Sequence, residues 1–337
     1  MKQVIQRYPF LFYGLSILLI GTGLLVGLMQ GYTSYSPFQV LQGLVGYSQG
    51  DISALSTIVG ELRFPRLLMA IAVGLGLSTS GVVMQSIFRN PMADPYILGI
   101  SSGAALGIVL SVTLGLDSFI GARVVEVGAF LGALLVSVAM IIVAGQYGRN
   151  PSRFLMTGVA LAAVCGGITG ILIFIGAGQS GMDLTLYWMM GSIAFVPLRS
   201  AGLSFVFALV GFVFFMFQTR ILHLMREGET VAITLGRPLK GYIRLYLLIN
   251  AIMVAAIVMH SGIIGFVGLI VPHAVRLFVG ANLRLLLPMS AILGMLLSIG
   301  ADVIGRIAIS GVDLPLGVIF AVLGAPLFMT MLIQRSR

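Results

Sequence analysis

The sequence predicts an all-α polytopic membrane protein, and three observations carry this prediction. Hydrophobic residues make up 59% of the chain and charged residues only 9%, whereas about a quarter of the residues in a soluble domain are charged. The mean hydropathy is +1.11. Apolar stretches of about 20 residues, the length that crosses a bilayer as a helix, recur along the whole chain. A single transmembrane domain over residues 1–337 therefore accounts for the composition.

The apolar stretches number ten, at residues 10–29, 67–88, 94–115, 121–145, 154–177, 201–220, 242–260, 262–280, 285–305 and 314–333. The first is longer than the apolar core of a signal peptide, so we expect it to remain as the first membrane helix. A further run at 184–196, around Trp188, has only 13 residues. It is too short to cross and is expected to form a half-helix or re-entrant piece.

Small residues recur at helical spacing, at Gly99, Gly103 and Gly107 and again at Gly128 and Gly132. Such spacings let helix backbones approach closely in lipid, where no hydrophobic effect drives helices together. We therefore expect close helix packing at these glycines.

Charge predicts the orientation. With ten spans, one side of the membrane carries most of the basic residues: Lys2, Arg7, Arg89, Arg149, Arg153, those of residues 218–244, Arg276, Arg284, Arg335 and Arg337. The opposite side carries acidic residues, and residues 31–62 there contain no Lys or Arg. Because the positive side faces the cytoplasm, both termini are expected there. An eleventh span would move the C-terminal arginines across the membrane and break this pattern.

Basic residues on the outer side need a local reason. Arg123 is expected to pair with Glu126, one turn along the same helix. Arg306 follows Asp302 by four residues, so these two side chains can also pair on one helix face.

Arg63 and Arg66 open the second span, where Pro65 suits a first helical turn and marks the expected helix start. Position alone leaves two interpretations for Arg63, Arg66 and Arg306. They either anchor the chain at the membrane surface or form a basic patch that docks an acidic partner outside the cell.

Residues 218–244 contain seven charges, at Arg220, Arg226, Glu227, Glu229, Arg237, Lys240 and Arg244. Burying them at a bilayer centre would cost on the order of 20 kcal/mol, so the segment lies in water or against another protein. Val231 and Leu235 are one helical turn apart, and Gly236 and Pro238 stop the helix. A short, partly apolar helix surrounded by charge is therefore predicted, either as a solvated loop or as an element that inserts into a partner.

Several classes of function are disfavoured. The chain has no G-x-x-x-x-G-K-[ST] motif, and its only lysines are Lys2 and Lys240, so it does not hydrolyse ATP by itself. Its three histidines lie on separate segments and its one cysteine, Cys165, lies in an apolar run. No catalytic residue, metal site or cofactor is therefore expected in this chain. The arginines are divided among short loops, as membrane orientation requires, so nucleic-acid binding is not predicted.

An ion-coupled secondary transporter is the alternative class. Such carriers use intramembrane acids, but Asp302 and Glu126 both have arginine neighbours in the sequence, which disfavours an ion relay. Breaks in the helices at 90–95 and 261–268 favour a pathway through the molecule, because irregular backbone at membrane depth is tolerated against protein or water. A short kinked packing helix is the other interpretation.

Six segments together resemble, in chain order, the permease subunits of type II ABC importers. They are 63–66 (RFPR), 85–103 (QSIFRNPMADPYILGISSG), 188–192 (WMMGS), 265–276 (GFVGLIVPHAVR), and 313–317 (DLPLG) with 324–328 (GAPLF). This family imports ferric siderophores, haem, vitamin B12 and, in some members, molybdate. At the position of Asp313 the family usually has glutamate.

The resemblance implies a homodimer of ten-helix subunits in the cytoplasmic (inner) membrane of a bacterium or archaeon. Two separate ATP-binding cassette subunits would hold ATP and Mg at the cytoplasmic face. A periplasmic or lipid-anchored binding protein would dock on the other face and select the cargo. Alternating access would then be driven by the partners' ATP cycle. Because the binding protein would select the cargo, the sequence of this chain hardly indicates which cargo is carried.

The resemblance also implies roles for three groups of residues. The coupling loop, 218–241, would fit a cleft of the ATPase through Arg226, Glu227, Glu229, Val231, Leu235, Gly236 and Arg237. The binding protein would dock on Arg63, Arg66 and Arg306. Cytoplasmic gates would lie at Asn90 and Met92 and at Pro151 and Ser152.

Overall fold

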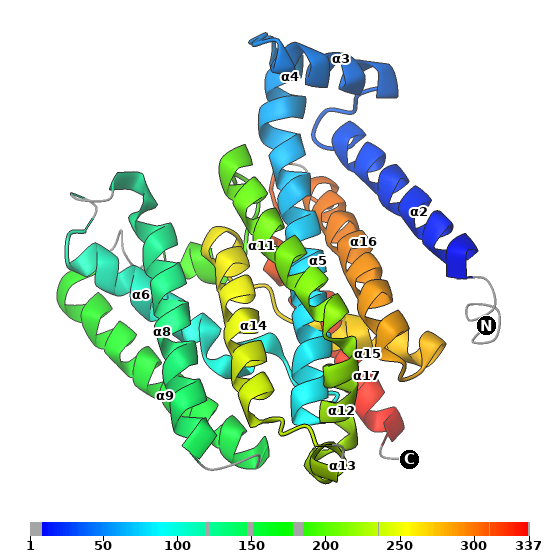
Figure 1. Ribbon diagram of the computed structural model, residues 1–337. Coiled ribbons are helices and arrows are strands. Elements are labelled where there is room, and N and C mark those ends of the chain that lie inside the picture. Colours follow the sequence, from blue (N-terminus) through cyan, green and yellow to red (C-terminus); the bar gives the residue numbers. More distant parts are fainter. Residues whose placement is uncertain are drawn as a thin grey trace.

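The computed structural model describes residues 9–116, 118, 121–146, 151–177, 185–234, 236–309 and 311–335. Within these ranges the secondary structure is helical apart from turns, loops and one isolated β-bridge between Ile309 and Val312. The prediction of an all-α protein is therefore confirmed (Figure 1).

The longer helices make up the bundle (Figure 1). They are α2 (Pro9–Met29), α5 (Phe64–Phe88), α6 (Ile100–Thr113), α8 (Val124–Gln146), α9 (Pro151–Leu172), α11 (Leu198–Phe217), α14 (Lys240–Ser261), α15 (Val267–Val279), α16 (Leu283–Ile307) and α17 (Leu316–Arg335). Among the described residues, six helical stretches are long and apolar enough to cross a membrane, and four apolar helices are shorter. Each predicted apolar stretch falls on one of these ten.

Short helices mark the two ends of the bundle. One end, called the α3 end below, carries α3 (Pro37–Ser48), α4 (Ala54–Ser56) and the π-helix η1 (Thr57–Arg63). The other, the α12 end, carries α12 (Thr219–Glu227) and α13 (Glu229–Thr234). The remaining pieces are the 3-10 helices η2 (Pro95–Leu98) and η3 (Gly121–Arg123) and the π-helix η4 (Ile173–Ala177).

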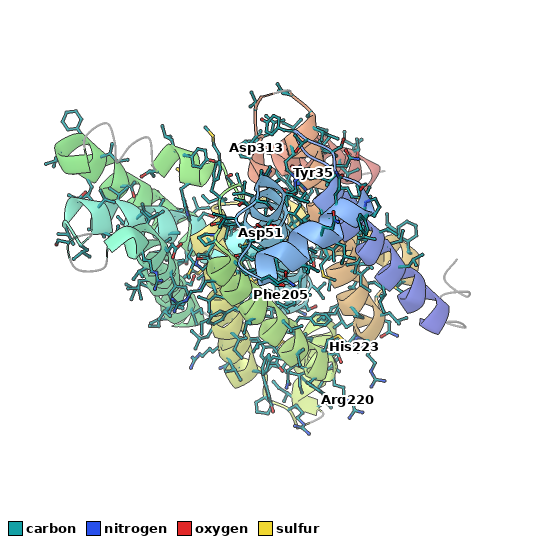
Figure 2. All side chains as sticks on the ribbon, turned by 90° about the horizontal axis from the view of Figure 1, so that it is seen from above. Tyr35, Asp51, Phe205, Arg220, His223 and Asp313 are labelled. Atoms are coloured by element: carbon teal, nitrogen blue, oxygen red, sulfur yellow. The ribbon has the colours of Figure 1, made fainter. Side chains whose placement is uncertain are left out.

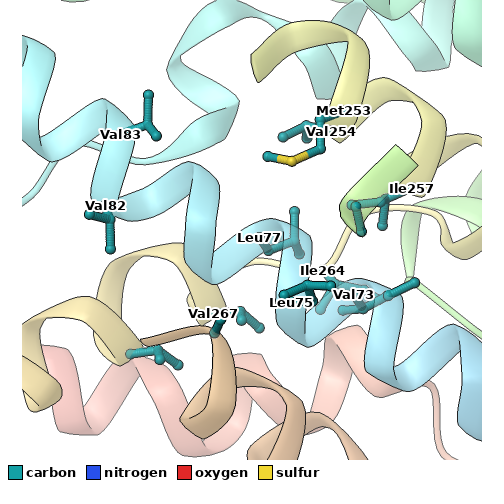
Figure 3. Close-up of a cluster of buried hydrophobic side chains, with 14 of the residues drawn as sticks. Val73, Leu75, Leu77, Val82, Val83, Met253, Val254, Ile257, Ile264 and Val267 are labelled. Carbon is teal, nitrogen blue, oxygen red and sulfur yellow. The ribbon is translucent and has the colours of Figure 1, made fainter. Parts of the chain in front are cut away.

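Helix α5 is the centre of the structure. It contacts α11, α14, α15 and α16, and 89% of the apolar window of this span is buried inside the protein. Figure 3 shows its apolar side chains, among them Val73 and Leu77, beside Val254 and Ile257 of α14. Two glycines permit this burial, because a Cβ at Gly74 or Gly81 would collide with the backbone of α16 or α15.

Helices α6, α8 and α9 form a second group, which meets the rest of the bundle mainly where α8 packs on α14 (Figure 1). The glycines predicted to pack closely do so: Gly103 and Gly107 of α6 lie against Gly132 and Gly128 of α8, backbone to backbone. The expected small-residue packing is thus confirmed at the α6–α8 contact.

A methyl group at this contact should be costly. In the variant Gly107→Ala, the new Cβ would overlap the carbonyl of Gly128, and we expect a loss of about 1–3 kcal/mol of unfolding free energy. Gly202→Ala on α11 is the matched control, because nothing lies within 4 Å of its Cβ position. Unfolding in detergent micelles measures both, and equal effects of the two variants would contradict the close contact.

The second span begins earlier than predicted. Its helix runs without interruption from Ala54 to Phe88, so the expected start at Pro65 was wrong. The first turn is capped by Ser53, whose hydroxyl accepts the N–H of Ser56. Pro65 is tolerated inside because the preceding π-helical stretch already shifts the hydrogen bonds, with the N–H of Phe64 bonded to the carbonyl of Val59.

This helix is longer than a bilayer core. At about 1.5 Å per residue its 35 residues span roughly 50 Å, against about 30 Å of hydrocarbon. One end must project into water, and α3 lies across that end (Figure 1). Sequence patterns did not predict α3, which starts with a capping box between Ser36 and Gln39.

The short run around Trp188 is confirmed as a half-helix. Residues 185–189 are helical, and 191–197 are irregular up to the start of α11. Residues 184 and below in this connection lie outside the described part of the chain.

Candidate functional site

At the α12 end, the charged segment forms two short helices against the bundle. The buried face of α12 carries Leu222 and Met225, which pack where α12 contacts α5 and α16. The opposite face carries Arg220 and His223, which point away from the bundle (Figure 2). An amphipathic helix thus fixes the predicted coupling loop to the membrane domain.

Helix α13 follows after a sharp turn at Gly228. The φ of Gly228 is +122°, a backbone conformation that favours glycine. The helix ends as predicted at Gly236, with φ +68°. The N–H of Gly236 donates to the carbonyl of Ile233 and that of Arg237 to Ala232, a Schellman motif.

The side chains of α13 divide into buried and exposed. Ala232 is fully buried, whereas Val231 is 44% exposed and Ile233 is 61% exposed. Leu235 and the side chain of Glu229 lie outside the described residues. The short helix with exposed apolar side chains is as predicted, and its role in coupling to an ATPase stays a prediction.

The other charged residues predicted for coupling take different positions. Glu227 lies 3.9 Å from His223, and both side chains are half exposed. Arg237 is exposed. Arg226 instead turns towards the protein and donates from Nη1 to the carbonyl of Ala281, 2.5 Å away, in the turn between α15 and α16.

The two predicted gate segments lie close together. Asn90 follows α5 and accepts the N–H of Met92 with its side-chain oxygen at 2.9 Å. Pro151 begins α9, and the side chains of Pro151 and Ser152 lie outside the described residues. The rings of Phe88 and Phe154, whose centroids are 4.8 Å apart, join the end of α5 to the start of α9. A gating role for these residues stays a prediction.

Four short segments of the chain meet inside the bundle. The N–H of Gly317 donates to the carbonyl of Gly191 at 2.9 Å. A Cβ at Gly191 would collide with the carbonyl of Ile263, and one at Gly262 with that of Trp188. The hydroxyl of Tyr96 both donates to the carbonyl of Ile264, at 3.2 Å, and accepts its N–H, at 3.1 Å.

These contacts join four parts of the chain that the sequence singled out, 95–98, 188–192, 261–265 and 313–317. The hydrogen bond from Gly317 to Gly191 and the two to the Tyr96 hydroxyl satisfy backbone groups of these segments within the protein, which is the condition for irregular backbone inside a membrane protein.

Helices α5 and α15 are linked by a buried glutamine. The Gln85 amide donates to the carbonyls of Gly268 and Leu269 at 3.3 and 3.4 Å, and its oxygen accepts from Nη2 of Arg276 at 2.9 Å. Gln85 is 3% exposed. Sequence patterns did not predict this link, although all four residues belong to the segments that resemble the family motifs.

At the α3 end, Arg66, Asp302, Arg306 and Asp313 form a buried charge cluster. Arg66 Nε lies 2.5 Å from Asp302 Oδ1, and Arg66 Nη1 lies 3.0 Å from Asp313 Oδ2. Arg306 Nη2 lies 2.8 Å from Asp302 Oδ2, which confirms the predicted pair one turn apart. Asp302 is 1% exposed.

Two arginines also hold the end of α2. Arg63 donates from Nη1 to the carbonyls of Leu28 and Met29, at 2.6 and 2.9 Å. Arg306 donates from Nη1 to those of Gly27 and Gln30, at 2.9 and 3.0 Å. Cationic side chains thereby satisfy the last carbonyls of the helix, where its dipole is negative.

The arginines predicted to dock a binding protein are therefore turned inward. Arg63, Arg66 and Arg306 are only 6–7% exposed, and each donates to acceptors within the chain. Direct contact with a partner's carboxylates would require this cluster to open. The docking role stays a prediction, and it now requires that the buried arginines become exposed when the partner binds.

A network around Asp51 shapes the projecting end. The Asp51 carboxylate accepts from the hydroxyls of Ser53 and Ser56, at 2.6 and 2.9 Å, and from the N–H of Ser53. The hydrogen bond from the Ser53 hydroxyl is the main cause that lowers the pKa of Asp51 below its ordinary value, with further contributions from Ser56 and the Ser53 N–H.

The expected pair of Arg123 and Glu126 is replaced by another. Arg123 lies in η3 and is exposed, while Glu126 lies 3.6 Å from Nε2 of His260 on α14. Nδ1 of His260 lies 2.8 Å from the hydroxyl of Ser204 on α11. In the part of the chain that the structure describes, no group of three or more His, Cys, Asp or Glu is arranged to hold a metal.

A bundle of apolar helices with irregular backbone at its centre is the architecture of a multi-pass membrane transport protein. The chain belongs to the FecCD transport family, whose model matches residues 17–334.

Relatives in this family are named as permeases. The chain is 38% identical, over 83% of its length and 74% of the relative's, to the cobalamin import system permease protein BtuC of Halobacterium salinarum. It is 36% identical, over 82% and 83%, to the hemin transport system permease protein HmuU of Yersinia pestis.

Two solved structures are similar. One is described as an inward-facing conformation of a metal-chelate type ABC transporter, with a TM-score of 0.82 and 28% identity, covering 97% of this chain and 100% of that one. The other, PsaBC from Streptococcus pneumoniae, has a TM-score of 0.55 and 18% identity over 86% of this chain and 94% of that one, and shows the fold alone.

Proposed function

We propose that this chain forms the membrane pathway of an ATP-driven importer for a metal chelate. The cargo would be a ferric siderophore, haem or cobalamin, with a molybdate-type oxyanion as a further class. The names of relatives that carry cobalamin and hemin support this range. The observation that carries the proposal is the α12–α13 element, a short helix with exposed Val231 and Ile233, held at the end of the central helix α5.

The proposed arrangement has ten membrane helices, with both termini and the α12 end in the cytoplasm. Basic residues at the α12 end, such as Arg89, Arg220 and Lys240, support this orientation. Residues 1–337 form one transmembrane domain, and residues 218–241 form its coupling loop. Two ATP-binding cassette subunits bind there and supply ATP and Mg, because the sequence has no nucleotide-binding motif. A binding protein docks on the α3 end.

Two copies of the chain would enclose the pathway. The apolar window of the α9 span is only 11% buried within one chain. On α17, Val322, Leu323 and Met329 are each at least 60% exposed. Lipid and a second copy together would cover these faces, and ATP-driven closure of the ATPase pair would move the two protomers between inward- and outward-open arrangements.

Co-purification and reconstitution test the proposal. An affinity-tagged chain should bring down an ATPase, and proteoliposomes with the binding protein should take up cobalamin, haemin or a ferric siderophore only when ATP is supplied to the ATPase. A chain that never retains an ATPase and moves these cargoes along an ion gradient without ATP would instead be a secondary carrier.

A further inference from the structure

Arg226 differs from the other charged residues of the coupling loop whose side chains the structure describes. It lies in the last turn of α12 and is half-buried. Its Nη1 donates to the carbonyl of Ala281 at 2.5 Å. By contrast, Arg220, Arg237 and Lys240 are exposed. A charge-assisted hydrogen bond to a backbone carbonyl is among the stronger single contacts that a loop can make.

The turn that Arg226 holds is itself well defined. Gly280 adopts φ +75° and donates its N–H to the carbonyl of Arg276 at 2.9 Å, which ends α15. Asn282 accepts the N–H of Arg284 with its side chain at 3.1 Å, which begins α16. A displacement of Ala281 is therefore passed to the ends of two helices.

Helix α15 connects the Ala281 turn to the central helix α5. Gln85 of α5 is hydrogen-bonded to α15 at two places, at the carbonyls of Gly268 and Leu269 and at the side chain of Arg276. The backbones of Gly81 and Gly268 also touch. Just before α15, the 262–264 segment contacts the half-helix around Trp188. The turn between α15 and α16 is thus connected both to the central helix and to the irregular centre of the bundle.

We propose that Arg226 is a positioning residue that fastens the coupling loop to the α15–α16 turn, so that the loop and α15 move as one body. This inference rests on the proposed function, in which ATPase subunits move the loop. It assigns Arg226 a role inside the permease and not at the surface that meets the ATPase. The apolar face of α12 holds the loop against α5 and α16, and Arg226 adds the link to α15.

The experiment measures the separation of α12 and α15. Spin labels are placed on His223→Cys and Leu277→Cys in a Cys165→Ala background. Both positions are at least half exposed, so the labels leave the packing intact. The chain is studied with its ATPase, without nucleotide and with ATP. With Arg226 intact, we expect one narrow distance distribution that is the same in both conditions.

Arg226→Met keeps the aliphatic stem and removes the donor. We expect its distance distribution to broaden about twofold and to shift when ATP is added. Arg226→Lys, which can still donate to the Ala281 carbonyl, should restore a narrow distribution. Arg220→Met on the exposed face of α12 is the matched control and should behave as the unsubstituted chain.

A narrow, unmoved distribution in Arg226→Met would overturn the inference. If Arg226→Met were merely misfolded, it would also fail to retain the ATPase. A broadened distribution in a variant that retains the ATPase therefore reports the loss of this one contact. Failure of the proposed function looks different, because the unsubstituted chain would then retain no ATPase. Even in that case, the measurement without nucleotide tests whether Arg226 holds the coupling loop to the α15–α16 turn.

Discussion

Replacing both Val231 and Ile233 with aspartate is expected to abolish ATP-driven uptake. In the proposed complex, these exposed side chains enter a cleft of the ATPase, where two carboxylates would lose water without gaining partners. Even about 3 kcal/mol of lost affinity weakens binding by roughly a hundredfold. Retention of the ATPase on the tagged chain, together with uptake into proteoliposomes, measures the effect.

A control separates the apolar contact from added charge. His223→Asp introduces a carboxylate on the exposed face of α12, in the same loop. It should leave ATPase retention within about threefold of the unsubstituted chain, since isolated surface charges contribute little. If the double aspartate variant still retains the ATPase and imports cargo normally, α13 is not the element that inserts into the partner.

Asp302→Asn should produce the largest loss of stability. Asp302 is the acceptor shared by Arg66 and Arg306 in the buried cluster. Neutralising it leaves two buried guanidinium groups short of a counter-charge, which costs about 3–5 kcal/mol in comparable buried pairs. Chemical unfolding in detergent micelles measures the change. Glu61→Gln, an exposed acid at the same end, is the matched control and should change the free energy by less than about 0.5 kcal/mol.

A double variant makes this prediction sharper. Removing Arg306 together with Asp302, as Arg306→Met with Asp302→Asn, leaves Arg66 with Asp313 and restores the balance of charge. Residues in one ion-pair network do not contribute additively. The double variant should therefore lose less stability than the sum of the two single variants, and strict additivity would contradict the network.

Local features of the fold could be predicted from the sequence. The ten apolar stretches follow from composition and length. Close packing at the glycines of α6 and α8 and the pair of Asp302 and Arg306 follow from spacing along one helix. The half-helix near Trp188 followed from its length. In each case the signal is contained within about one span, where composition and periodicity are informative.

Contacts between distant segments could not be predicted in this way. The positive-inside rule recognised Arg63 and Arg306 as exceptions, but it could not show that they donate to the end of α2. The link of Gln85 to Arg276 and the contact of Glu126 with His260 join helices far apart in the sequence. The start of the second span was missed because a π-helical stretch accommodates Pro65, which in regular α-helix marks a first turn.

The π-helical stretch also sets how the projecting end is rotated. A π-turn holds one residue more than the α-helix it replaces, and one residue in an α-helix corresponds to about 100° of rotation. If the same residues, Thr57–Arg63, formed a regular α-helix without any deletion, everything before them would turn by about 100° about the axis of α5. Helix α3, whose Gly43 packs on Val59, would swing away from its place above α2. The angular position of the α3 end therefore depends on the π-helical geometry of this one stretch.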